Sequence, residues 1–145
     1  MACVYQSQAP DVIAGSTRLV ALLGHPAAHS LSPRMQNAAF AALALDLAYV
    51  AFDVPPERLE GALTGLAELG FVGANVTAPH KQAVARLVGG GLPSVNTLVF
   101  REDGIEAHST DAAVLAGLSA ERPAIVGGGG SAAAFAAALP HARRF

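Results

Sequence analysis

The 145-residue chain has few of the residues that several common kinds of site require. Cys3 is its only cysteine, so neither an internal disulfide nor a thiolate metal site is expected. Charged residues make up 14% of the chain and the net charge is −2, which argues against nucleic acid or an anionic membrane as the main partner. The N-terminus has no basic segment followed by an apolar one, and the longest apolar run, 38–45, is too short to span a bilayer. These absences predict a cytoplasmic protein.

Lysine is as scarce as cysteine: Lys81 is the only lysine, whereas the chain has eight arginines. At that ratio a basic position would rarely be a lysine. An amine, unlike a guanidinium, can give up its proton. Chance is one explanation of the exception, and the favoured one is that position 81 needs an amine.

Apolar runs and turn residues alternate along the chain as they do in α/β proteins. Three helices are predicted in the first part of the chain. Ser32 caps the first, and the third runs through Val84 and Leu87. The second has an apolar stripe made of Leu59, Leu63, Leu66 and Leu69. The predicted strands are 19–23, 47–54, 71–76 and a hairpin around Asp103-Gly104, followed by a helix at 111–118, a strand at 124–126 and a helix at 131–139. The expected fold is an open, mostly parallel sheet with flanking helices, one antiparallel addition and the start of a second sheet.

Two serines follow the first predicted strand, in the loop at 24–33. Ligands of open α/β sheets lie beyond the carboxyl ends of the strands, and helix N-termini favour anions. The hydroxyls of Ser30 and Ser32 are therefore candidates for binding a small carboxylate. The alternative is structural: Ser32 caps the helix that starts at Pro33, and Ser30 is solvated.

A second polar set follows the third predicted strand, in the sequence Asn75-Val76-Thr77-Ala78-Pro79-His80-Lys81. Its amide, hydroxyl and amine lie within one turn and suit a polyhydroxylated small molecule; the alternative is a capped helix with a solvated lysine. Asn96 and Asp111 stand at two later boundaries, in Val95-Asn96-Thr97 and Ser109-Thr110-Asp111. Asp111 is also an ordinary first-turn residue of a helix, since its charge complements the macrodipole.

A glycine-rich turn of the form G-x-G-x-x-A separates the strand at 124–126 from the last helix. This position is typical of the phosphate-binding turn of a Rossmann-type domain. The predicted cofactor-binding residues are Gly127, Gly128, Gly129, Gly130 and Ser131. The sequence thus predicts two domains: residues 17–109, and residues 110–145 as a crossover helix with the first β-α unit of a nucleotide-binding domain.

Taken in order, HSxSP, NVTxPHK, VNT and TD resemble the shikimate dehydrogenase family over residues 19–139. The resemblance implies an enzyme that uses NADP (NADPH) to reduce 3-dehydroshikimate reversibly to shikimate in aromatic amino-acid biosynthesis. It implies that Ser30 and Ser32 hold the substrate carboxylate, and that the ring hydroxyls are surrounded by Asn75, Thr77, Lys81, Asn96 and Asp111. Lys81 and Asp111 would carry the proton transfer, and a coupled pair does not reveal which is the formal acid or base. The implied partner is the small-molecule substrate, shikimate or 3-dehydroshikimate. No nucleic-acid partner, membrane partner or metal is expected, and the protein is expected to be a monomer or homodimer.

The sequence departs from the family pattern at several positions. Ser109 stands where the family has an asparagine, and Ala133 stands near a position that is often basic. The span from Lys81 to Asn96 is several residues shorter than usual, and glycines 89–91 replace its acidic residues. The chain ends at Phe145, about where the strand that selects NAD or NADP is expected to begin. About 100 further residues are expected in a complete enzyme.

Two other functions stay open at this point. One is a module that binds shikimate or quinate without dehydrogenase activity, and the other is an α/β domain whose motifs act only as caps. A polypeptide ending at Phe145 is expected to bind shikimate but to bind NADPH poorly, with the strand at 124–126 unpaired.

Overall fold

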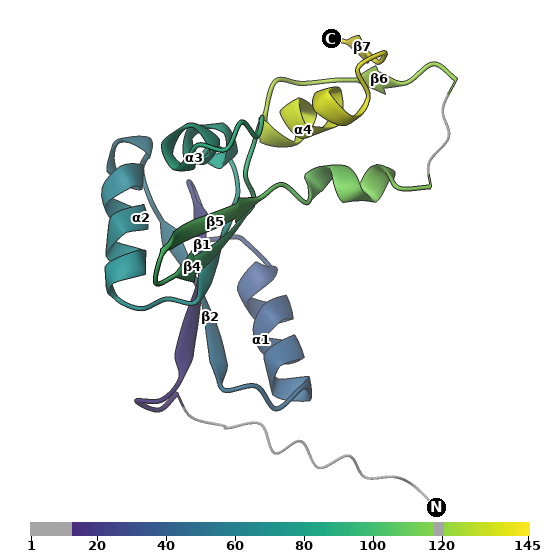
Figure 1. The fold of residues 1–145 in the computed structure, drawn as a ribbon. Helices are drawn as coiled ribbons and strands as arrows, with labels where there is room; N and C mark the ends of the chain where they lie inside the picture. The colour runs from purple at the N-terminus through teal and green to yellow at the C-terminus, as the bar shows by residue number, and fades with distance from the viewer. Residues whose placement is uncertain (1–12, 118–120) are drawn as a thin grey trace, which may run out of the picture.

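The structure, a computed structural model, describes residues 13–117 and 121–145 (Figure 1). Cys3 lies outside the described residues, and so does Leu118, the last residue of the helix predicted at 111–118. Among the residues described, no helix is both long enough and apolar enough to cross a bilayer.

A five-stranded sheet in the order β2-β1-β3-β4-β5 forms the centre of the molecule. Its strands are β1 (Arg18–Gly24), β2 (Leu47–Asp53), β3 (Gly73–Val76), β4 (Thr97–Arg101) and β5 (Gly104–His108). The first three are parallel, with β1 between β2 and β3. The predicted hairpin adds β4 antiparallel to β3, and β5 antiparallel to β4. The predicted mostly parallel α/β sheet is confirmed.

Three helices cover the two faces of this sheet: α1 (Ser32–Ala42), α2 (Leu59–Glu68) and α3 (Lys81–Val88), with the 3-10 turn η1 (Pro56–Arg58) leading into α2. α1 lies on the opposite side of the sheet from α2 (Figure 1). The main core forms where Leu59, Leu63 and Leu66 of α2 and Val84 of α3 pack on the sheet. Burying such side chains contributes about 1.5–3 kcal/mol each.

The third helix runs through Val84 and Leu87 as predicted, as α3. Two details of the other predicted helices are wrong. Leu69 is 77% exposed, because α2 ends at Glu68 and Gly70, with φ of +75°, turns the chain away. Ser32 is the first residue of α1 rather than its cap, since Leu31 already has helical backbone angles. The hydroxyl of Ser30 accepts a hydrogen bond from the Ser32 N–H at 3.2 Å.

A smaller unit follows the hairpin and lies beyond one end of the sheet (Figure 1). It contains η2 (Asp111–Leu115), β6 (Ala124–Ile125), α4 (Gly130–Ala138) and β7 (Arg143–Arg144). η2 is a short 3-10 helix instead of the predicted helix over 111–118, because Ala116 is extended and Gly117 has φ of +81°. β6 is not the unpaired strand we expected: it pairs in parallel with β7, which begins two residues before Phe145.

The outer strand β2 is joined to α1 through one amide. The side chain of Asn37 donates to the backbone oxygen of Tyr49 at 2.9 Å and accepts from its N–H at 2.8 Å. Both backbone groups of Tyr49 are thus satisfied on the side away from β1. The contact fixes Tyr49, whose side chain reaches into the polar site.

Candidate active site

The carboxyl ends of β1 and β3 are held together by close backbone contacts. The Thr77 N–H donates to the Leu23 oxygen at 2.9 Å, and the His25 N–H donates to the Ala78 oxygen at 3.1 Å. A Cβ on Gly24 would lie 2.5 Å from Cγ2 of Thr77, so only glycine allows this approach. The first two predicted motifs therefore meet at one edge of the sheet, as the rule for ligand sites in α/β sheets predicts.

His80 fixes the turn that leads into α3. Its side chain is only 1% exposed, and its Nε2–H donates to the Val54 carbonyl oxygen at 2.7 Å, which ties the turn after β3 to the segment after β2. Lys81, the next residue, starts α3 from this anchored position. We did not single out His80 from sequence; its place beside Lys81 in the motif was the available signal.

Lys81 and Asp111 form a short ion pair. The Lys81 ammonium lies 2.7 Å and 3.0 Å from the two carboxylate oxygens, and the side chains are 16% and 13% exposed. Burial raises the pKa of Asp111, but hydrogen bonds from Lys81 and Ser131 outweigh it, so the pKa lies below its ordinary value of 3.8. Asp111 is therefore ionised at neutral pH beside an amine.

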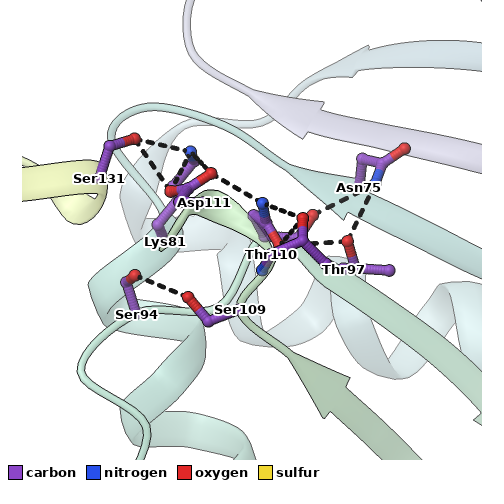
Figure 2. Close-up of polar contacts among 9 residues, drawn as sticks. Asn75, Lys81, Ser94, Thr97, Ser109, Thr110, Asp111 and Ser131 are labelled. Atoms are coloured by element: carbon purple, nitrogen blue, oxygen red, sulfur yellow. Dashed lines mark hydrogen bonds and ion pairs between the residues drawn. The ribbon is translucent and has the colours of Figure 1, made fainter. Parts of the chain in front are cut away.

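Asn96 extends the pair toward the sheet. Its side-chain amide donates to Oδ1 of Asp111 at 2.7 Å, and its carbonyl oxygen accepts from the Thr110 N–H at 3.0 Å. These two bonds orient both the amide and the first turn of η2. Asp111 thus has fixed partners on two sides (Figure 2).

Asn75 joins the same network from β3. Its side-chain amide donates to the Asn96 backbone oxygen at 3.2 Å and to the Thr97 hydroxyl at 3.3 Å. The Tyr49 hydroxyl donates to Oδ1 of Asn75 at 2.8 Å, and burial raises the pKa of Tyr49 to about 12, so this hydroxyl keeps its proton. Tyr49 and Thr97 were missed from sequence: Tyr49 lies in no recognised motif, and Thr97 stands in the VNT motif but was given no role of its own.

The glycine-rich turn closes one side of a cavity of about 600 Å³ next to the ion pair. The opposite side is lined by Thr77 to Pro79, Lys81 and Gln82. All five predicted cofactor-binding residues line it: Gly127, Gly128, Gly129, Gly130 and Ser131. Ser131 also reaches the ion pair itself, with its hydroxyl 3.0 Å from the Lys81 ammonium (Figure 2).

The structure thus brings most of the predicted site residues into one polar region. Asn75, Lys81, Asn96 and Asp111 are linked by hydrogen bonds, directly or through one neighbour. Thr77 lines the cavity beside Lys81. Ser30 and Ser32 are absent from the lining of this cavity, and their contact is with each other. Their role as carboxylate ligands stays a prediction.

The ion pair of Asp111 should make the free energy of unfolding vary with pH in the acidic range. Because the pKa of the folded carboxyl is depressed, its stabilising contribution is complete above the ordinary pKa of 3.8 and is lost as the pH falls through the folded pKa. Asp111→Asn should therefore be less stable than wild type at neutral pH, and the difference should shrink below about pH 4. Denaturant unfolding of both proteins across this range measures it; a difference independent of pH would contradict the lowered pKa.

The fold and the site together define a class of protein: an α/β protein whose polar pocket lies between an open sheet and the glycine-rich turn of a Rossmann-type unit. Residues 22–90 match the family model described as the shikimate dehydrogenase substrate binding domain. The chain belongs to the shikimate dehydrogenase family.

Individual relatives give the extent of the similarity. The shikimate dehydrogenase (NADP(+)) of Methanopyrus kandleri is 53% identical over 105 residues, 66% of this chain and 35% of that protein. That of Anaeromyxobacter dehalogenans strain 2CP-C is 47% identical over 141 residues, 88% of this chain and 51% of that protein. A crystal structure of shikimate 5-dehydrogenase from Thermus thermophilus in complex with NADP(H) and shikimate matches with a TM-score of 0.71 and 35% identity, over 85% of this chain and 52% of that chain. This chain spans at most about half the length of these relatives.

Proposed function

We propose that this protein takes part in the NADP-dependent, reversible reduction of 3-dehydroshikimate to shikimate in aromatic amino-acid biosynthesis. The observation that carries the proposal is the Lys81–Asp111 pair, which lies beside a cavity bounded on one side by the turn after β3 and on the other by the glycine-rich turn. We assign residues 17–109 to substrate binding and residues 110–145 to the start of the nucleotide-binding domain. A cytoplasmic location and a monomeric or homodimeric assembly stay predictions from the sequence.

The substrate is a ring with a carboxylate and several oxygens, and the chain offers groups of matching kinds. Asn75, Thr77 and Asn96 present amides and a hydroxyl that hydrogen-bond ring hydroxyls. Ser30 and Ser32 would hold the carboxylate from the loop after β1. Family membership supports both assignments. The network that links Asn75, Asn96 and Asp111 supports the assignment of the residues around the ring hydroxyls.

The reaction needs a proton at the ring oxygen, and the ion pair supplies the groups to move it. In the reducing direction the ketone carbon gains a hydride, and its oxygen gains a proton from the Lys81–Asp111 pair. Lys81 Nζ can donate to the oxygen, while Asp111 keeps the ammonium in place and shares the titration. In the oxidising direction the same pair accepts the proton.

The glycine-rich turn fits one phosphate of a dinucleotide. A Cβ on Gly128 or Gly129 would meet nothing within 4 Å, so the backbone there is open to a ligand. The first N–H groups of α4 have no partner within the helix, and a helix N-terminus favours an anion. NADPH, when bound, supplies the hydride; the relatives are named as NADP(+) enzymes, which supports this cofactor.

A shikimate titration of the 145-residue chain, followed by isothermal calorimetry, tests the substrate assignment. Saturable binding is expected, and cyclohexanecarboxylate, which lacks the ring hydroxyls, should bind much more weakly. Equal binding of both acids, or none, would refute the assignment. A fluorescence titration with NADPH, with and without shikimate, in a preparation with the complete nucleotide-binding domain then separates an enzyme from a binding module: shikimate binding without any NADPH binding would favour the module.

A further inference from the structure

The Ser131 hydroxyl makes two hydrogen bonds of a particular kind. It accepts from the Lys81 ammonium at 3.0 Å and donates to Oδ2 of Asp111 at 2.9 Å (Figure 2). A substrate alcohol that exchanges a proton with this pair would make the same two bonds. A serine from the nucleotide-binding unit therefore occupies a position that suits a substrate hydroxyl.

No free donor is left on the ammonium in this arrangement. An ammonium has three N–H groups, and Lys81 has three acceptors: the two oxygens of Asp111 and the hydroxyl of Ser131. Oδ2 of Asp111 accepts from both Lys81 and Ser131, and Oδ1 accepts from Lys81 and Asn96. A ring oxygen can bond to Lys81 only after one of these contacts breaks, and Ser131 is the only neutral partner among the three.

Gly130 allows the approach that brings Ser131 to the pair. A Cβ on Gly130 would overlap Cβ of Lys81, so α4 begins directly against the lysine stem. Any other residue at 130 would push the start of α4 away from α3. The contact thus rests on a glycine in the sequence as well as on the serine after it.

We propose that Ser131 is a positioning residue that holds the Lys81–Asp111 pair in place of a substrate hydroxyl, and that a bound substrate displaces it. The inference rests on the proposed function for the identity of the substrate. Under this proposal, the Ser131 hydroxyl and a hydroxyl of the substrate ring compete for the same two groups, the Lys81 ammonium and the Asp111 carboxylate. Removal of the hydroxyl should therefore favour the substrate.

The test compares shikimate affinity in wild type, Ser131→Ala and Ser131→Thr. Ser131→Ala should bind shikimate about threefold to tenfold more tightly, because the fraction of molecules with a free pair rises. Ser131→Thr keeps the hydroxyl and should resemble wild type. Ser94→Ala, which removes a serine hydroxyl that bonds to the Ser109 hydroxyl at 3.4 Å, should leave the affinity unchanged.

A second measurement works without substrate, so the inference and the proposed function can fail separately. The Ser131 hydroxyl is one cause of the lowered pKa of Asp111, so carbon-13 NMR of the Asp111 carboxyl should show a higher pKa in Ser131→Ala than in wild type or Ser131→Thr. An unchanged pKa would overturn the contact, whatever the protein binds. If the pKa rises but shikimate affinity is unchanged or weaker, displacement by substrate is overturned; if no variant binds shikimate, the proposed function fails and with it the substrate's part in this inference.

Discussion

Lys81→Arg is expected to lower the turnover of shikimate oxidation by about 100-fold or more, the usual scale for a general acid–base group. Arginine keeps the positive charge beside Asp111, but a guanidinium does not give up its proton in a protein. Shikimate affinity should fall less than turnover, since an ionic partner for Asp111 remains. The initial rate of NADP⁺ reduction at saturating shikimate, in a preparation with the complete nucleotide-binding domain, measures the effect.

The matched control for this variant is the reverse exchange on the same helix. Arg86→Lys changes an exposed residue of α3 that is not among the hydrogen-bond or ion-pair partners of Lys81 and Asp111 in the described part of the chain, and it should leave both rate and affinity unchanged. A Lys81→Arg variant with nearly full turnover would remove Lys81 from the proton transfer. A loss of turnover with an equal loss of affinity would instead indicate that the larger side chain displaces the start of α4.

Ser30→Ala is expected to weaken shikimate binding by about tenfold to 150-fold, because a hydrogen bond to a charged group contributes about 1.5–3 kcal/mol. Turnover at saturating shikimate should change little. The Ser30 hydroxyl also accepts from the Ser32 N–H at the start of α1, so the variant should lose some stability as well. Affinity is therefore measured at a temperature where unfolding curves show both proteins fully folded.

Ser16→Ala is the control for the loss of a serine hydroxyl. Ser16 bonds to Asp46 at 2.9 Å on the exposed side of the amino end of β1, far along the strand from Gly24. This variant should bind shikimate as wild type does. Unchanged affinity in a folded Ser30→Ala protein would exclude Ser30 as a carboxylate ligand.

The sheet could be predicted from sequence because its signals are local. Short apolar runs ended by glycine or proline mark β1, β2 and β3, and Asp103-Gly104 marks the hairpin. Apart from the missed pairing of β6 with β7, the errors lie at helix ends, where one residue's backbone angles decide the boundary. Ser32 was expected as a cap, but Leu31 is already helical; η2 stops early, because the chain is extended at Ala116.

The site was predictable only in part, for a different reason. Asn75, Lys81, Asn96 and Asp111 stand in recognisable motifs, and the rule that ligands lie at carboxyl ends of strands places their segments together. The bond between Lys81 and Ser131 joins residues 50 positions apart, and depends on how α4 packs on α3. No motif encodes that packing, so Ser131 was assigned to the cofactor alone. Tyr49 was missed for the same reason: its hydroxyl reaches Asn75 across β1.

The amide of Asn37 has a consequence for how this molecule meets other chains. β2 is an outer strand of the sheet, and the backbone groups of an outer strand can pair with a strand from another molecule. At Tyr49, in the middle of β2, the backbone N–H and carbonyl already bond to the side-chain amide of Asn37. The amide takes the place of the two backbone bonds that a neighbouring strand would make there. An incoming strand would have to break both bonds before it could pair along β2. α1, which carries Asn37, therefore also hinders the pairing of another chain along the β2 edge of the sheet.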